Sequence, residues 1–442
     1  MKKIQTLSES SFLKMFFALL SGAFVVAAFF MPDRDTMLSG LWQIVSQPGK
    51  ISTNDFDLGG YAATFLNMGL VGLCFTALFY LLKATANNVS TLAFILTLGF
   101  CSWGITVVNI WPTILGVVVY SLVRKEKPGA NINAMMFSTG IAPLITDLLI
   151  RYPNPEVVGF NLPGLLLALI VGFLIGFMLP AGLGHAPNVH KGFDLYSAAV
   201  PVCFFAFFLN AALYKTMGID LPAVTSDLTV ASRAIVNIFC CIVFGACIVF
   251  ALAMGCKPKE YLGLLKAPAH VGNVSGTLGI PVFLMNVGVY GLFILAYYNL
   301  IGATFNGITF GIIFCMLCTC NSGSHPGNVW PIMLGYVVAS TVAGWLSALA
   351  GGSFSLAINA QAIAVGLCFA NGLSPITSKY GWFWGMVSAI MHYLLVTSVP
   401  NMHGGYCLYN GGFTAAVICL ILVPELERFV KTKDERKALK NS

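Results

Sequence analysis

Long apolar runs follow one another almost without interruption along this chain of 442 residues. A helix needs about 20 residues to cross the ~30 Å hydrocarbon core of a bilayer, and most of the runs approach that length. The pattern predicts an all-α polytopic membrane protein. The expected membrane segments are 12–31, 59–82, 90–107, 109–123, 131–150, 162–182, 194–214, 230–255, 278–300, 303–320, 328–349, 354–373, 379–397 and 406–427.

Two regions contain short runs with little between them. The segment 90–123 forms either two brief crossings or one re-entrant hairpin, and 303–349 leaves the same two alternatives. In both cases the chain emerges on the side of the membrane that it left.

The composition supports a membrane location. Hydrophobic residues make up 58% of the chain and charged residues only 9%, whereas soluble domains carry about 25% charge. This excludes a large soluble enzyme, a nucleic-acid-binding module and a disordered chain. Most of the 13 cysteines lie inside apolar runs. The spacing of Cys315, Cys318 and Cys320 is weak evidence for a metal site, so we expect no metal or cofactor.

The basic residues are distributed unequally between the two sides of the membrane. If every run crosses once, eighteen of the 23 lysines and arginines share the side of the N-terminus. Because basic residues concentrate in cytoplasmic loops, both termini are predicted to be cytoplasmic. The net charge of +7 then anchors the protein and requires no acidic partner. The opposite side receives only Arg34, Lys50, Arg151, Lys215 and Arg233.

An internal duplication runs through the sequence. Residues 109–121 read NIWPTILGVVVYS and residues 328–340 read NVWPIMLGYVVAS, which are identical at eight of thirteen positions. PNVHKGFDLY at 187–196 likewise matches PNMHGGYCLY at 400–409 at six positions. Such self-similarity indicates that the chain contains two copies of one structural unit.

Each copy contains an odd number of crossings, five or seven depending on the hairpin. The second copy must therefore enter the membrane from the other side, which predicts two inverted-topology repeats with broken or re-entrant helices. The expected organisation is a first repeat at 12–215, an extracellular linker at 216–229, a second repeat at 230–428 and a basic cytoplasmic tail at 429–442.

The duplicated Asn-x-Trp-Pro motif provides the first candidate site. A proline suits the first turn of a helix, so Pro112 and Pro331 are each expected to start one. The preceding residues would then face a helix N-terminus, which attracts anionic or dipolar groups. The candidate substrate-binding residues in this motif are Asn109, Trp111, Asn328 and Trp330.

Further polar residues lie near the same motif. The stretch 319–327 is rich in glycine and polar residues, and irregular backbone of this kind beside membrane segments either lines a cavity or forms an ordinary solvent-exposed loop. Asn67 and Asn286 occupy matched places inside crossings and are as suited to bonding a neighbouring helix as to binding a solute. This adds Asn67, Asn286, Asn321, Ser322 and His325 to the substrate-binding candidates.

The repeated Pro-Asn-x-His-x-Gly motif places a histidine in equivalent loops on opposite sides of the membrane. His190 with Tyr196, and His403 with Tyr409, could form paired gates or carry protons. The alternative is a helix-capping turn that both copies need for the same corner.

Asp147 is the one carboxylate well inside a predicted crossing. Intramembrane carboxylates often couple transport to H⁺ or Na⁺, which makes Asp147 a candidate for gating or proton transfer. The alternative is a shallow residue that reaches water, because the predicted outer end of the segment is close. His392, alone on an apolar helix, is expected to be a satisfied buried residue.

The duplicated Asn-x-Trp-Pro-x-x-Leu-Gly and Pro-Asn-x-His-x-Gly segments resemble a bacterial membrane family catalogued as domain of unknown function 1576, whose members carry the domain twice. The resemblance implies a bacterial cytoplasmic membrane protein and supplies no activity. By architecture alone, two inverted halves with re-entrant helices are similar to urea-transporter-like channels.

These observations favour a transporter or channel-like permease that moves a small polar or anionic solute through a midplane site between the repeats. We expect no enzymatic activity. The alternatives are an intramembrane enzyme acting on a membrane-accessible substrate and a non-transporting sensor or scaffold. The expected partners are the lipid bilayer and a small-molecule or ion substrate. The sequence is also compatible with a homo-oligomer.

Overall fold

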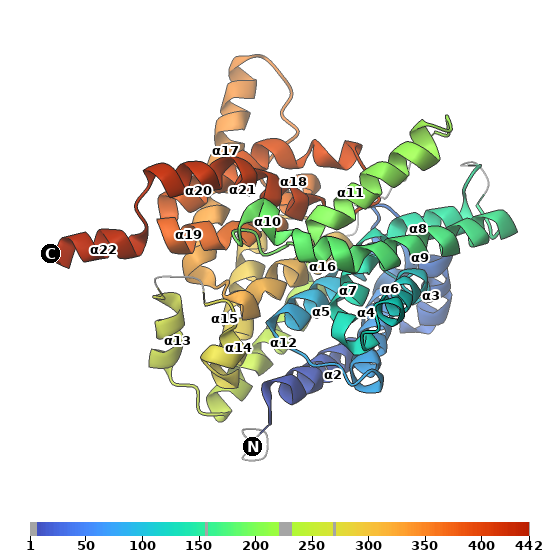
Figure 1. Cartoon of the computed structure of the whole chain (residues 1–442), viewed down its shortest axis with the longest axis horizontal. Helices are drawn as coiled ribbons and strands as arrows, with labels where there is room; N and C mark the ends of the chain where they lie inside the picture. Colours follow the sequence, from blue (N-terminus) through green and yellow to red (C-terminus); the bar gives the residue numbers. More distant parts are fainter. Residues whose placement is uncertain (1–6, 155–157, 221–231, 268–270, 442) are drawn as a thin grey trace.

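The computed structural model describes residues 7–154, 158–220, 232–267 and 271–441, and this part of the chain is helical and contains no strand. Figure 1 shows the helices packed around a centre formed by α5 and α16. Eight helical segments are long and apolar enough to cross a membrane. The protein is therefore an all-α polytopic membrane protein, as the apolar runs predicted. Residues 221–229 of the expected linker lie outside the described residues.

The first half contains ten helices in the described residues. They are α2 (Glu9–Ala28), α3 (Met37–Ser46), α4 (Asp55–Leu81), α5 (Asn88–Phe100), α6 (Trp111–Val123), α7 (Ile132–Ser138), α8 (Ala142–Ile150), α9 (Leu162–His185), α10 (Pro187–His190) and α11 (Ala199–Asn210), which continues as a π-helical turn over Ala211–Lys215.

The second half follows a similar order, with α14 and α15 where the first half has the kinked α4, a 3₁₀ turn (Val399–Asn401) in the place of α10, and an added terminal helix. Its helices are α12 (Arg233–Ala253), α13 (Pro258–Leu265), α14 (Val274–Thr277), α15 (Ile280–Leu300), α16 (Gly307–Leu317), α17 (Pro326–Leu349), α18 (Gln361–Ala370), α19 (Ser374–Tyr380), α20 (Trp382–Val396), α21 (Asn410–Phe429) and α22 (Lys433–Asn441). Helix α2 packs on α4 as α12 packs on α15, and α6 packs on α9 as α17 packs on α20.

The segment 90–123 forms a helical hairpin. Its second arm ends beside the start of its first, because a Cβ added at Gly129 would lie 2.4 Å from the carbonyl oxygen of Leu82 and 3.3 Å from the Cα of Ala84. In the second half, Asn306 Nδ2 donates to Gln361 Oε1 at 2.8 Å, which joins the start of α16 to the segment that follows α17. Both hairpins thus return to the side that they entered from.

Outside the hairpins, each half has five main helical segments: α2, α4, α7–α8, α9 and α11 in the first, and α12, α15, α18–α19, α20 and α21 in the second. Seven of these ten are among the candidate membrane spans, and the eighth candidate is α17 of the second hairpin. We call the side on which α2 begins and α21 ends the basic face, and the side on which α11 ends the opposite face. The odd number inverts the second half relative to the first.

The two hairpins lie antiparallel at the centre of the molecule. Ser102, after α5, donates its hydroxyl to the carbonyl of Gly307 at the start of α16, at 2.7 Å. At the other end, Asn321 Nδ2, after α16, donates to Thr91 Oγ1 at 3.1 Å. Small residues allow the helices to approach closely, since a Cβ on Gly311 would lie 2.3 Å from the carbonyl oxygen of Gly99.

One crossing in each half is broken at the same point. Helix α7 passes into α8 through the 3₁₀ turn Thr139–Ile141, and α18 passes into α19 through Asn371–Leu373. Pro143 and Pro375 stand at the second positions of α8 and α19, where the missing N–H cannot continue the preceding hydrogen-bond ladder. The breaks position the loops described below.

Candidate functional site

The tip of the first hairpin is organised by Asn109. Its Nδ2 donates to the carbonyl of Gly104 and to Thr146 Oγ1, both at 2.9 Å, and its Oδ1 accepts from the backbone N–H of Thr106 at 2.8 Å. The residue is 3% exposed and lies just before α6, as the motif predicted. Its amide therefore ties the tip to the broken crossing.

Asn328 makes the same set of contacts in the second hairpin. Its Nδ2 donates to the carbonyl of Gly323 at 2.9 Å and to Ser378 Oγ at 3.1 Å, and its Oδ1 accepts from the backbone N–H of His325 at 2.9 Å. The two tips thus share one geometry. In this conformation both asparagine amides bind protein groups, so their assignment to solute binding stays a prediction.

The expectation that Pro331 starts a helix is wrong. Helix α17 begins at Pro326 and Pro331 lies inside it, so Asn328 belongs to the first turn of the helix instead of preceding it. The residue whose side chain caps α17 is His325, which accepts from the N–H of Gly327 at 3.1 Å. The second copy has an extra helical turn before its proline, which the shared motif does not reveal.

Asn67 and Asn286 hold the hairpin tips from the side. Asn67 Nδ2 donates to the carbonyls of Cys101 and Ile105, each at 2.8 Å. Asn286 does the same to the equivalent carbonyls of the second tip, each at 2.9 Å. Both side chains are fully buried. These matched asparagines bond a neighbouring segment, which was one of the two alternatives for them.

Asn321 and Ser322 are buried in the second tip, where Asn321 Oδ1 accepts from the N–H of Ser275 at 2.8 Å. Of the stretch 319–327, residues 319–325 are buried under protein, so the solvent-exposed alternative is wrong for them, and only Gly327 is exposed. Trp111 and Trp330 lie apart from the tips' interior and are 45% and 41% exposed on the surface. The structure does not bring these two indoles to the buried asparagines.

The first Pro-Asn-x-His loop is a closed turn around His190. The Nδ1 of His190 accepts from the N–H groups of Gly192 at 3.2 Å and Asp194 at 3.3 Å. The proton of the neutral ring is therefore on Nε2, which lies 2.8 Å from Ser197 Oγ and donates to it. This arrangement is a closed turn that caps no helix, since neither α10 nor α11 has a side-chain cap, and the gating role of His190 stays a prediction.

The second loop repeats the turn but leaves its polar atoms unpaired. The Nδ1 of His403 accepts from the N–H of Cys407 at 3.1 Å. Its Nε2 is buried without a hydrogen-bond partner, and so is the Oδ1 of Asn410, which stands where the first loop has Ser197. Burial lowers the pKa of His403 to about 4, so the ring is neutral.

Each loop docks on the broken crossing of the other half. The N–H of Leu195 donates to the carbonyl of Gly372 at 3.1 Å, and the N–H of Leu408 donates to the carbonyl of Gly140 at 2.9 Å. A Cβ at Gly140 would lie 1.8 Å from the ring of Tyr409. Only glycine permits this approach, and the reciprocal contacts join the two halves at both ends.

The tyrosines that end the two loops differ in their partners. The hydroxyl of Tyr196 donates to Asn371 Oδ1 at 2.6 Å, and the hydroxyl oxygen of Tyr196 also lies 2.9 Å from the carbonyl oxygen of Cys315. The hydroxyl of Tyr409 is buried without a partner. The gating role assigned to these tyrosines stays a prediction, although the structure brings both to the contact between the halves.

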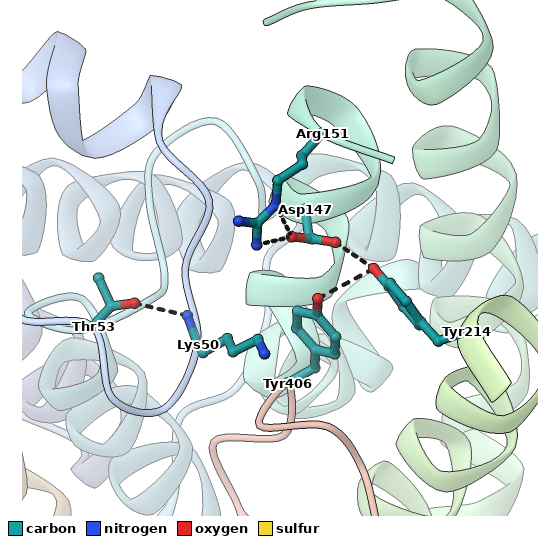
Figure 2. A network of polar contacts seen from close by, with 6 residues as sticks. All are labelled: Lys50, Thr53, Asp147, Arg151, Tyr214 and Tyr406. Atoms are coloured by element: carbon teal, nitrogen blue, oxygen red, sulfur yellow. Dashed lines mark hydrogen bonds and ion pairs between the residues drawn. The ribbon is translucent and has the colours of Figure 1, made fainter. Parts of the chain in front are cut away.

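Asp147 lies in a buried polar cluster near the opposite face (Figure 2). It forms an ion pair with Arg151 at 2.6 Å and accepts a hydrogen bond from Tyr214. Tyr406 of the second loop donates to Tyr214 at 3.2 Å. The Nζ of Lys50 lies 5.5 Å from the centre of the Tyr406 ring, within cation–π range. The cluster therefore connects the first half to the loop of the second.

The expectation that Asp147 reaches water is wrong, because the side chains of Asp147 and Arg151 are 1% and 7% exposed. The sequence contained a signal for this partner, since Arg151 follows at the i+4 spacing of a helical ion pair. Burial lowers the pKa of Lys50, and the carboxylate of Asp147 opposes that shift.

Two buried carboxylates, Asp55 and Asp194, were missed by the sequence reasoning. They are 2% and 2% exposed, each has one oxygen without a hydrogen-bond partner, and no ion pair reaches either within the described ranges. Burial raises the pKa of Asp194 to about 7, and a hydrogen bond from the N–H of Tyr196 opposes the shift. Asp194 stands inside the repeated motif, but Cys407 replaces it in the second copy.

The remaining histidine prediction is confirmed. His392 is fully buried, with Nδ1 2.6 Å from the hydroxyl of Tyr336 and Nε2 2.8 Å from the carbonyl oxygen of Gly411. Within the ranges that the structure describes, no group of three or more His, Cys, Asp or Glu side chains could hold a metal ion.

Comparison with known families matches the chain over residues 33–216 and 268–428, one segment in each half. No match was found among curated proteins or among solved structures. The two segments together cover more than half of the sequence and agree with the duplicated helical order seen in the structure. The chain belongs to the family described as "Protein of unknown function (DUF1576)".

Proposed function

We propose that this protein is a membrane transporter that moves a small polar or anionic solute between its two inverted halves. The reciprocal docking of the loops carries the proposal. Each loop is bonded through one backbone N–H to the broken crossing of the other half, at Gly140 and Gly372. Inverted repeats with discontinuous helices at their contact are typical of secondary transporters, in which one end opens while the other closes.

The solute site is proposed beside the second loop. His403 Nε2–H, Asn410 Oδ1 and the hydroxyl of Tyr409 are buried and have no protein partner, whereas the equivalent atoms of the first loop are bonded. Buried polar groups are normally paired, so an unpaired set at the contact between two halves favours a hydrogen-bonding ligand. A histidine N–H and a hydroxyl suit an anion or a neutral polar solute.

The end of the pathway at the opposite face is closed in this conformation. The side chains of Asp147, Arg151 and Tyr214 fill the space between α8 and α11, which leaves no volume for a water-sized sphere. Opening this end requires Tyr406 to separate from Tyr214, because these two hydroxyls connect the halves at 3.2 Å. Asp147 then acts as a gate residue in the proposed cycle.

Native cysteines provide the test of this motion. Cys203 on α11 and Cys407 in the second loop belong to different halves, and their Sγ atoms are 3.0 Å apart. Diamide accepts two electrons and two protons from the thiols and would join them in a disulfide. We expect solute uptake into proteoliposomes to fall to background after this treatment and to recover with dithiothreitol.

The control is Cys203→Ser, which cannot form the bond and should transport equally with and without diamide. Peptide mapping by mass spectrometry verifies the Cys203–Cys407 linkage. Uptake that continues at the full rate in the verified, linked protein would contradict the proposed movement. The solute panel should include ammonium, urea, small carboxylates and amino acids, each with and without sodium.

Proton coupling is proposed through Asp194, since buried carboxylates without a cation mark ion and proton routes. With a pKa of about 7, Asp194 carries a proton below neutral pH and loses it above. Uptake should therefore decline as the pH of the loading side rises through about 7. Asp194→Asn should remove this pH dependence, whereas Asp35→Asn, at a fully exposed carboxylate, should leave it unchanged.

A further inference from the structure

We propose that the junction of α19, α20 and α22 binds the phosphate of an anionic phospholipid headgroup at the basic face. A cavity of about 540 Å³ opens there, which lies within the usual size range of small-ligand sites. Helix α22 extends from the body of the protein beside α19, at the C-terminal end of the chain (Figure 1). The cavity is lined by Lys433, Arg436, Lys437 and Lys440 of α22 and by Trp382 and Trp384 of α20.

The fold holds the basic helix against the start of α20. Arg436 donates from Nη2 to the carbonyl oxygen of Tyr380, the last residue of α19. Gly381 follows with φ of 108°, and a Cβ there would lie 3.3 Å from the Arg436 guanidinium. A glycine at this turn therefore allows α22 to pack across the junction and places its cations at the mouth of the cavity.

The cations in the cavity are not neutralised by its walls. None of the described residues that line it is acidic. Glu435 of the same helix turns back to its own cap, where its Oε2 accepts from the N–H of Thr432 at 2.7 Å. Burial and the neighbouring Arg436 lower the pKa of Lys433, and Asp434 opposes the shift. Bringing several positive charges together in this way favours an anionic ligand.

The backbone adds to this preference. Helix α20 runs for 15 residues, and no side chain caps its N-terminus, which begins at Trp382 in the cavity wall. Free N–H groups and the positive end of a helix dipole bind phosphate oxygens. Four cations and this helix end converge on one cavity, which distinguishes it from the other basic loops.

A lipid headgroup fits better than a soluble phosphate because the cavity opens onto an apolar surface. Trp382 and Phe383 are 54% and 48% exposed, and Trp330 of α17 stacks on Trp382 with 6.4 Å between ring centroids. Exposed tryptophans mark the level of lipid headgroups, and basic clusters next to a membrane helix bind anionic lipids. The acyl chains would lie along the exposed faces of α17 and α20.

The test compares lipid binding by the full-length, delipidated protein and two triple variants. Fluorescent phosphatidylglycerol is titrated in detergent, with phosphatidylcholine as the neutral lipid. Each lysine that lines the cavity is expected to raise the affinity for an anionic lipid about fivefold. Lys433→Gln, Lys437→Gln and Lys440→Gln together should therefore weaken phosphatidylglycerol binding on the order of a hundredfold. Phosphatidylcholine should bind weakly to all proteins.

The matched control is Arg124→Gln, Lys125→Gln and Lys127→Gln, which removes equal charge from an exposed loop on the same face. These residues do not line the cavity, so binding of a headgroup inside it should change little. An equal loss in the control would show diffuse attraction to the face and overturn the proposal, as would wild-type binding in the α22 variant. Competition by inorganic phosphate at the concentration of the lipid would assign the cavity to a soluble anion and also overturn it. Unchanged thermal unfolding verifies that both variants fold.

Discussion

The two copies of the Pro-Asn-x-His loop have the same backbone geometry and different chemistry. In both, histidine Nδ1 accepts from the N–H four residues later, and the leucine N–H bonds to a glycine carbonyl of the other half. In the first loop the histidine Nε2 and the final tyrosine are bonded, His190 to Ser197 and Tyr196 to Asn371, and one oxygen of Asp194 is buried without a partner. In the second loop the equivalent histidine and tyrosine atoms are buried without partners.

The charges beside the loops differ in the same way. Next to the second loop, Tyr406 leads through Tyr214 to the buried pair of Asp147 and Arg151. Next to the first, the pair of Lys191 and Glu427 is 52% and 38% exposed. The halves therefore share a scaffold. The second loop contains the unpaired histidine, tyrosine and asparagine atoms that a ligand could use, and the first contains the unpaired carboxylate of Asp194.

The largest difference in the free energy of unfolding is expected between variants of the ion pairs that lie beside the two loops. Asp147→Asn leaves Arg151 buried without its counter-ion, and breaking such a pair costs roughly 3–5 kcal/mol. Lys191→Gln removes an exposed pair and should cost less than about 1 kcal/mol. Unfolding in mixed detergent micelles measures both. Equal costs would contradict the assignment of Asp147 and Arg151 to a desolvated gate.

The next largest effect is expected from substitutions at the two glycines on which the loops dock. Gly140→Ala places a Cβ 1.8 Å from the Tyr409 ring, and Gly372→Ala places one 2.6 Å from that of Tyr196. Overpacking of this kind costs about 1–3 kcal/mol, with the larger cost expected at Gly140. Gly245→Ala is the matched control, because nothing lies within 4 Å of its Cβ position. Docking is refuted if all three variants unfold alike.

The sequence predicted the helical segments and the duplication more completely than the partners of the polar residues in the two loops. Apolar run lengths and basic residue distribution depend on local composition, so the crossings and the inverted duplication could be inferred. The packing of the two hairpins against each other could not, because it is decided by long-range contacts such as that of Gly311 with Gly99.

The site was predicted in part for a related reason. Shared motifs identify the residues that both halves keep, and Asn109, Asn328, Asn67 and Asn286 prove to hold the backbone of the tips. The residues that differ between copies, such as Asp194 against Cys407, attract no notice in a search for repeats. They are the ones left unpaired or uncompensated when the loops are buried.

Removing the two tyrosine hydroxyls should sharpen the contrast at lower cost. Tyr196→Phe leaves Asn371 Oδ1 without its 2.6 Å partner, and an unsatisfied buried acceptor costs about 1–2 kcal/mol. Tyr409→Phe removes a hydroxyl that has no partner, so it should leave the free energy of unfolding unchanged or raise it slightly. The same denaturation assay ranks the two, and a larger loss at Tyr409 would mean that its hydroxyl is bonded in the membrane.

The smallest effect on the free energy of unfolding is expected from a substitution that makes the second loop resemble the first. Asn410→Ser gives the second loop the residue that stands at the equivalent position of the first, where Ser197 bonds the histidine Nε2 at 2.8 Å, and the new hydroxyl is expected to bond the unpaired Nε2–H of His403. One new buried hydrogen bond should raise the free energy of unfolding by up to about 1 kcal/mol. The same bond would occupy a donor proposed for the solute, so the KM for uptake should rise while the protein becomes more stable. If the Nε2–H of His403 has no role in solute binding, the variant should gain stability with an unchanged KM. Measuring both the free energy of unfolding and the KM therefore shows whether this N–H binds the solute.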